Sequence, residues 1–183
     1  MTSLAEESLL LKKTVILAIF SAAAVVLSVV EAMIPLGTLM VPGAKLGLAN
    51  IMILTCLYFL DGKDTFLLVV LKTLLTAMIL GTFSMLLFSL FGAMLSFVVM
   101  FGLMKISRRK LSLIGISVAG GIAHNIGQLA AAAIVIDSSS IFYYLPMLMI
   151  MGVATGVVVG IAVRYLINSL SNMKMFAPFA KEV

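Results

Sequence analysis

The chain has 183 residues, of which 63% are hydrophobic and only 10% are charged, and its net charge is +5. A soluble globular domain is nearer to about 45–50% apolar and about 25% charged. This excess of apolar residues cannot be buried in a soluble chain of this length, because most of its residues lie near the surface. The composition therefore excludes an ordinary soluble domain and predicts an integral membrane protein, with room for five to seven helices of about 20 residues each.

Several kinds of chemistry are also excluded. The single cysteine, Cys56, rules out an internal disulfide and a cysteine-rich metal site. The sequence has no Walker A loop for binding ATP and no serine-hydrolase or metalloprotease motif. The basic residues lie between apolar runs, where they orient a membrane protein rather than bind nucleic acid. We therefore expect no enzymatic activity, no metal or cofactor, and no nucleic-acid partner.

Six apolar stretches predict an all-α, polytopic membrane protein that forms one transmembrane domain over residues 1–183. They cover approximately residues 14–34, 46–60, 65–80, 84–104, 113–136 and 145–170. The second and third stretches are short for a hydrocarbon core about 30 Å thick. They either cross with help from flanking polar residues or form one tight helical hairpin. No small-residue cleavage site interrupts the first stretch, so we expect an uncleaved helix and no signal peptide.

The basic residues also predict how the chain is oriented. If the N-terminus is inside, the outer connections hold only Lys45 and Asp137, as the positive-inside rule requires. The residues then placed inside are Lys12, Lys13, Lys63, Lys105, Arg108, Arg109, Lys110 and Lys174. We expect both termini in the cytoplasm and the protein in a bacterial cytoplasmic membrane. The tract KISRRK (105–110) dominates this asymmetry, and a patch for lipid headgroups or a partner is the alternative interpretation.

Polar and ionisable residues inside a membrane are costly and therefore indicate function. Seven such residues are candidates for binding a substrate: Glu31, Lys45, Asn50, Lys72, His124, Asn125 and Gln128. With the N-terminus inside, they gather at the centre or in the outer half of the bilayer. They lie near an apolar loop, PLGTLMVPGAKLG (35–47), of a kind that folds back over the mouth of a bundle. We expect a pocket open to the outside, mildly positive, for an anionic or zwitterionic solute.

Each candidate has a structural alternative. Glu31 could lie at the water interface and face lipid headgroups, and Lys72 could pair with Glu31 or extend toward the interface. His124 could form a hydrogen bond between helices, as polar residues in membrane bundles often do. On a helix, His124 and Gln128 point the same way, and Asn125 lies about 100° around from His124.

Small residues recur every four positions in three of the stretches, which lets helix backbones approach closely. Two of these rows predict packing within the bundle: Gly115, Ala119, Ala123, Gly127 and Ala131 in the fifth stretch, and Gly152, Gly156 and Gly160 in the sixth. In the first stretch, Ala18 and Ala22 either pack internally or face another membrane subunit.

Two motifs, PGAKLGLANI (42–51) and GGIAHNIGQL (120–129), resemble the Gx transporter family, whose members are often called heptaprenyl diphosphate synthase component I. The resemblance covers nearly the whole chain. That family is grouped with the substrate-binding S components of energy-coupling factor (ECF) transporters, which are six-helix membrane proteins. Such components capture a scarce vitamin or precursor at the outer face and associate with a transmembrane coupling subunit and two ATPase subunits.

The resemblance also implies roles for particular residues. Lys45 and Asn50 lie in the first motif, and both motifs would border the pocket. S components commonly dock on the coupling subunit through an Ala-xxx-Ala pair in the first helix, and Ala18 and Ala22 have this spacing. The resemblance thus implies an S component that captures a small solute, with isoprenoid or quinone precursors and vitamins as candidates.

The synthase name fits the residues less well. Prenyl diphosphate chemistry needs carboxylates that hold magnesium against the diphosphate, and the only aspartates are Asp61, Asp64 and Asp137, which are expected on opposite faces. An accessory membrane subunit of prenyl-diphosphate or quinone biosynthesis is therefore the alternative function, and a membrane scaffold or channel is a third.

Overall fold

The computed structural model describes residues 4–34, 47–81, 83–106 and 111–179, and it contains only helices there. The α-helices are α1 (Leu4–Met33), α3 (Ala49–Phe59), α4 (Gly62–Leu80), α5 (Phe83–Ile106), α6 (Leu113–Ile136) and α7 (Leu145–Ser171). Two short 3-10 helices, η1 (Ser139–Tyr144) and η2 (Ala177–Phe179), flank α7. The all-α class and the six predicted helices are confirmed.

The helix boundaries agree with the predicted stretches to within three residues, except at the start of α1. That helix begins at Leu4, ten residues earlier than expected, because its polar first turns continue the helix beyond the apolar run. Glu6 and Glu7 lie in its first turn, where negative charge stabilises the helix dipole. The apolar run therefore marks the membrane segment of α1 and not the whole helix.

Four helices, α1, α5, α6 and α7, are long and apolar enough to cross a membrane. Helices α5 and α6 have 24 residues each, which corresponds to about 36 Å. Helix α3 has 11 residues, or about 17 Å, and is too short to cross by itself. Helix α4 has 19 residues, or about 28 Å, and carries Lys63, Asp64 and Lys72. The protein is thus a multi-pass membrane protein whose second apolar stretch is a half-length helix.

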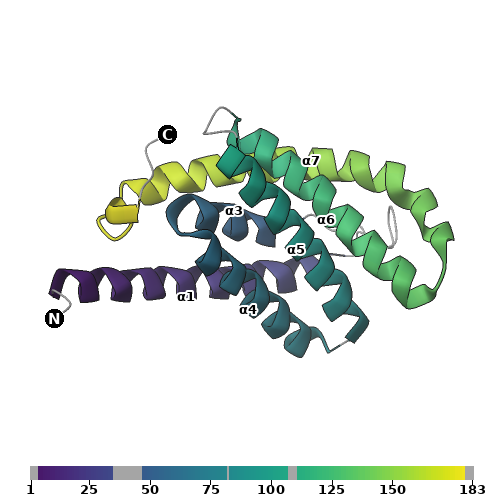
Figure 1. The fold of residues 1–183 in the computed structure, drawn as a ribbon, viewed down its shortest axis with the longest axis horizontal. Coiled ribbons are helices and arrows are strands. Elements are labelled where there is room, and N and C mark those ends of the chain that lie inside the picture. Colours follow the sequence, from purple (N-terminus) through teal and green to yellow (C-terminus); the bar gives the residue numbers. More distant parts are fainter. Residues whose placement is uncertain (1–3, 35–46, 82, 107–110, 180–183) are drawn as a thin grey trace.

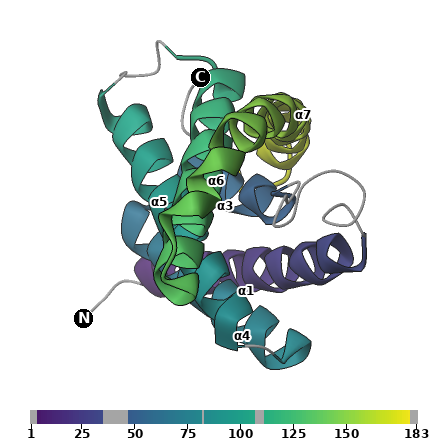
Figure 2. The ribbon, with the colours of Figure 1, turned by 90° about the vertical axis from the view of Figure 1, so that its right-hand side faces the viewer.

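Helix α3 lies at the centre of the bundle (Figure 1). Ten of its 11 residues are buried, and it contacts α1, α4, α5, α6 and α7. Helices α5, α6 and α7 pack side by side, while α1 and α4 cover the opposite side of α3 (Figure 2). The start of α1 and the end of α7 lie at the same end of the bundle (Figure 1).

The glycine row of α7 packs against α6, as predicted. A Cβ atom on Gly156 would lie 2.6 Å from Val118 Cα, and one on Gly160 would lie 2.6 Å from Ile114 Cα. Only glycine permits backbones to approach this closely. The row on α6 packs only in part: Gly127 lies against the backbone of α5, but Gly115 is exposed and its predicted packing role is wrong. Its neighbour Ile114 meets Gly160 of α7, so the contact face of α6 at this end does not include Gly115.

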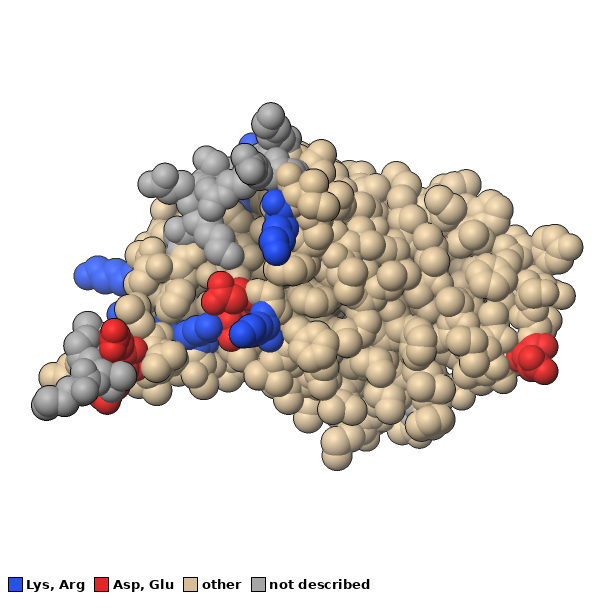
Figure 3. All heavy atoms as spheres, viewed as in Figure 1, with Lys and Arg blue, Asp and Glu red and all other residues tan. Residues whose placement is uncertain are grey.

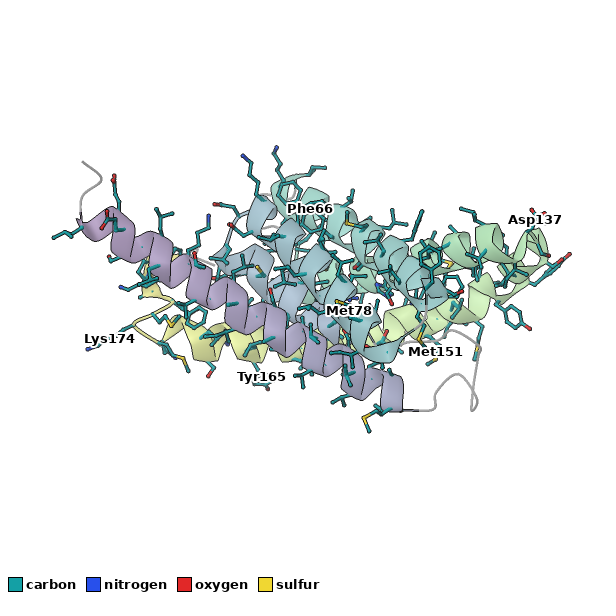
Figure 4. The ribbon with its side chains drawn as sticks, turned by 90° about the horizontal axis from the view of Figure 1, so that it is seen from below. Phe66, Met78, Asp137, Met151, Tyr165 and Lys174 are labelled. Atoms are coloured by element: carbon teal, nitrogen blue, oxygen red, sulfur yellow. The ribbon has the colours of Figure 1, made fainter. Side chains whose placement is uncertain are left out.

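The outer surface of the bundle is apolar over most of its length. In the face shown in Figure 3, the Lys and Arg side chains gather at one end, and an acidic side chain stands alone at the other. Figure 4 places Lys174 at the first end and Asp137 at the second, with Met78 and Tyr165 on the flanks between them. Large exposed apolar side chains, such as Met78 at 81% and Tyr165 at 73%, suit contact with lipid rather than water.

Candidate functional site

A small cavity lies between the start of α3, the first half of α6 and the middle of α7. It brings together three of the seven predicted residues, Asn50, His124 and Asn125. The described residues that line it are Gly47, Asn50, Ser117, Gly121, His124, Asn125, Thr155, Gly156 and Val159. The empty space is about 250 Å³ including the part open to the outside, but the enclosed part has room for only about one water molecule.

Helix α6 supplies most of the polar side chains. Ser117, Gly121, His124 and Asn125 are three or four positions apart or adjacent, so they share one side of the helix. The Nδ2 atom of Asn125 donates a hydrogen bond to the carbonyl oxygen of Leu148 in α7 at 2.7 Å. A Cβ on Gly152 would lie 3.0 Å from this Nδ2 atom, so the glycine row makes room for the amide. Asn125 therefore ties α6 to α7 at the edge of the cavity.

Helix α3 supplies Asn50 from its first turn. The backbone N–H of Asn50 donates to the carbonyl oxygen of Gly47 at 2.8 Å. Gly47 has a φ of +71°, a left-handed conformation that glycine adopts without strain. The Oδ1 atom of Asn50 is buried and accepts no hydrogen bond from the described residues. A buried acceptor in this state costs about 1–3 kcal/mol unless a ligand or an ordered water pairs with it.

Glu31 holds the start of α3 in place. Its two carboxylate oxygens accept hydrogen bonds from the backbone N–H groups of Gly47 at 2.6 Å and Leu48 at 3.1 Å. The side chain is buried, with 8% exposure, so it does not face lipid headgroups as one alternative proposed. The first N–H groups of a helix have no partners within the helix, and a carboxylate there also suits the helix dipole. Glu31 thus does not line the cavity itself but holds Gly47, which does.

The other three candidates lie elsewhere. Gln128 is buried one turn beyond His124, but it packs against Gly92 of α5, where a Cβ would lie 2.7 Å from Gln128 Cγ. Lys72 is buried on α4, with 5% exposure, on a helix that contributes nothing to the cavity lining. Lys45 and most of the apolar loop lie outside the described residues. The structure therefore does not bring Gln128 or Lys72 to this cavity.

Two hydroxyl groups in the lining were not predicted, those of Ser117 and Thr155. The Oγ1 atom of Thr155 donates to the carbonyl oxygen of Gly152 in its own helix at 3.4 Å. Ser and Thr in membrane helices often bond to the helix backbone in this way, so their presence in the sequence carries little information. The signal that could have identified them is their spacing: Ser117 is seven positions before His124, and Thr155 precedes a glycine of the packing row.

Ala18 and Ala22 both lie on the exposed face of α1. The same face carries Ile19 at 50% exposure and Val26 at 60%. Of the two predicted alternatives, internal packing is therefore wrong for this pair within the described bundle. The opposite face of α1 carries Phe20 and Ala24 and is the one that packs inward.

The described part of the cavity lining can both donate and accept hydrogen bonds. It combines two amides, an imidazole and two hydroxyls, and none of the described lining residues is a carboxylate. Within the described ranges no three His, Cys, Asp or Glu side chains group closely enough to hold a metal ion. These lining residues can therefore recognise a polar group by hydrogen bonds, and they offer no carboxylate ligands for magnesium.

Residues 20–166 match the sequence model of a family described as heptaprenyl diphosphate synthase component I. The match spans most of the bundle, from α1 to α7, and includes the whole cavity lining. The word "component" in this description implies a partner subunit. Neither a curated protein nor a solved structure matches the chain.

Proposed function

The chain belongs to the heptaprenyl diphosphate synthase component I family, and we propose that it is a non-enzymatic, solute-binding membrane subunit of an ECF-type importer. The observation that supports this function best is the convergence of Asn50, His124 and Asn125 on one cavity. These residues come from two helices far apart in sequence, and Asn50 keeps a buried acceptor without a partner among the described residues. A bound solute that pairs with this acceptor would remove its cost.

The lining also bears on the kind of solute. Amide, imidazole and hydroxyl groups suit an anionic or zwitterionic group, and apolar residues such as Val159 complete the wall. Isoprenoid or quinone precursors and vitamins combine such a polar group with an apolar part. The enclosed space holds only about one water molecule, which is much less than any of these solutes needs. A solute would therefore enter as the start of α3 moves away from α6 and α7.

The charged end of the bundle supports one orientation in the membrane. We propose that the end where Lys and Arg gather (Figure 3) is cytoplasmic. Both termini then lie in the cytoplasm of a bacterial cell, and Glu31 and Gly47 lie in the outer half of the membrane. Single cysteines at Ser138 and Lys174, in a Cys56→Ser background, test this arrangement. An impermeant thiol reagent should label intact cells at position 138 and not at position 174, and the reverse pattern would contradict the orientation.

The partners in this proposal are a transmembrane coupling subunit and two ATPase subunits. The exposed pair Ala18 and Ala22 leaves a shallow, apolar strip on α1 that another helix can approach closely. Replacing both with Leu should prevent co-purification of the coupling subunit, because the added side chains hold the helices apart. Ala32→Leu is the control, since it makes the same exchange once, at an exposed position near the end of α1 and outside the strip. Normal assembly of the double variant would assign the strip to lipid.

Solute uptake by cells tests the proposed function itself. His124→Leu and Asn50→Leu should each reduce uptake by about tenfold or more, the equivalent of one lost buried hydrogen bond. Thr76→Val is the control, because it removes a buried hydroxyl on α4, away from the cavity. Membrane expression should stay near normal for all three. Equal uptake by the variants and the control would refute the role of the cavity.

The family description favours a second candidate, an accessory membrane subunit of prenyl-diphosphate synthesis. The described lining residues include no carboxylate that could hold magnesium against a diphosphate, which fits an accessory role better than a catalytic one. Prenyl-transfer activity measured with and without the chain separates the two functions. Activity that requires the chain, together with uptake that does not, would favour the second candidate.

A further inference from the structure

A groove lies between the start of α4 and the second half of α5, well away from the cavity. It is lined by Asp61, Gly62, Lys63, Phe66, Phe97 and Phe101, and its empty space is about 920 Å³ including the part open to the outside. Neither the proposed solute site nor the exposed strip of α1 uses any of these residues. The groove opens on the outside of the bundle, at the end where Lys and Arg gather (Figure 3).

Three phenylalanine rings form the apolar wall. The rings of Phe97 and Phe101 stack with centroids 5.8 Å apart, and Phe66 meets Phe97 at 6.2 Å. Phe97 is buried, while Phe66 and Phe101 are 45% and 39% exposed. The Phe101 ring lies against Gly62, where a Cβ atom would be 2.6 Å from the ring. Any side chain at position 62 would displace the ring, so this glycine helps to set the shape of the groove.

The charges at the mouth of the groove are unevenly paired. Lys13 forms ion pairs with two carboxylates at the start of α4, Asp61 at the N-cap at 3.5 Å and Asp64 in the first turn at 2.9 Å. Lys63 and Lys105 are exposed, and neither forms an ion pair with another described residue. Lys105 lies one turn beyond Phe101 on the same face of α5. Lys63 therefore brings to the groove lining an ammonium group with no ion pair among the described residues, and Lys105 lies on the face of α5 that carries the aromatic wall.

We propose that this groove binds one anionic phospholipid. An acyl chain lies against Phe66, Phe97 and Phe101, and the phosphate of the headgroup pairs with Lys63 and Lys105. Such a lipid satisfies both features of the groove, since basic residues at the membrane surface attract anionic headgroups and aromatic side chains suit the interface.

The apolar wall of the groove favours a lipid over a helix of a partner protein. Helix-in-groove recognition uses apolar anchor residues spread over about two turns of a helix, whereas the apolar wall here consists of three rings, of which Phe97 is buried. A flexible acyl chain needs no such length of rigid contact.

Native mass spectrometry of the full chain tests this proposal. The protein is purified in a neutral detergent, and phosphatidylglycerol or phosphatidylcholine with identical acyl chains is added. We expect one phosphatidylglycerol to be retained in preference to phosphatidylcholine. The double variant Lys63→Gln and Lys105→Gln should weaken phosphatidylglycerol binding by about 25-fold. The control double variant, Lys12→Gln and Lys174→Gln, removes the same charge at exposed positions outside the groove. It should change the binding by less than about twofold.

A second pair of variants tests the apolar wall. Phe66→Leu should reduce retention of both lipids, whereas Phe83→Leu, at an exposed phenylalanine outside the groove, should not. Equal binding of the two lipids, or equal losses in the two lysine double variants, would overturn the proposal. Unchanged lipid binding together with loss of a co-purifying membrane subunit in Phe66→Leu would also overturn it and identify the groove as a subunit interface.

Discussion

Glu31 should determine whether the start of α3 is held at the cavity. Its carboxylate accepts two backbone hydrogen bonds, from Gly47 at 2.6 Å and from Leu48 at 3.1 Å. Hydrogen bonds to a charged group contribute about 1.5–3 kcal/mol each. Glu31→Gln keeps one acceptor oxygen but turns an NH₂ group toward the second N–H donor. It should therefore lower the free energy of opening this segment by about 1.5–3 kcal/mol, and Glu31→Ala by more, since it removes both acceptors.

Amide hydrogen exchange in detergent or nanodiscs measures this change where it occurs. A loss of about 1.5–3 kcal/mol corresponds to about 10- to 150-fold faster exchange when exchange proceeds through local opening. We expect this acceleration at the N–H groups of Gly47 and Leu48 in Glu31→Gln, and a larger one in Glu31→Ala. The protection of α6 and α7 should change little, because their contacts do not pass through Glu31.

Asp137→Asn is the matched control, because it makes the same carboxylate-to-amide change at the exposed C-terminal cap of α6. Asparagine tolerates the left-handed conformation that Asp137 adopts there, with φ of 52°. Exchange at positions 47 and 48 should be unaffected in this variant. If Glu31→Gln also leaves exchange at these positions unchanged, the two hydrogen bonds do not hold the start of α3 and the reasoning is refuted.

Two further variants test the packing around the cavity. Gly156→Ala should destabilise the protein by about 1–3 kcal/mol, because its Cβ would lie 2.6 Å from the backbone of α6 and overpack the interface. Gly102→Ala is the control and should not destabilise the protein, because no atom lies within 4 Å of the added Cβ. Equal unfolding temperatures of the two variants would contradict the packing argument. Asn125→Leu should cost about 0.6–1.7 kcal/mol, the usual range for an interhelical hydrogen bond in a membrane, because the bond to the Leu148 carbonyl is lost. An unchanged unfolding temperature in detergent would show that this bond contributes nothing.

The helices could be predicted from the sequence because apolar runs and their interruptions directly reflect burial in lipid. The boundaries of α6, for example, coincide with the predicted stretch at both ends. The packing of the α7 glycine row could also be predicted, since a four-residue spacing puts small residues on one face. The start of α1 could not be predicted, because polar residues outside the membrane can extend a helix without any apolar signal.

The site could be predicted only in part, because sequence spacing does not show which helices meet. The polar residues of α6 were identifiable from their cost in a membrane. Their pairing with Asn50 depends on α3 being a half-length helix whose start reaches the middle of the bundle. The role of Glu31 could not be predicted either, since its partners are backbone N–H groups, which every residue except proline has.

The most direct measurement is the mass of any small molecule that the purified protein retains from its native membrane. If the cavity binds a solute, native mass spectrometry should find one non-lipid molecule of defined mass on the wild-type chain. Asn50→Leu should lose this molecule, because it removes the buried acceptor at the cavity, whereas Thr76→Val should retain it. Retention of the same molecule by Asn50→Leu, or loss of it from both variants alike, would contradict binding at this cavity.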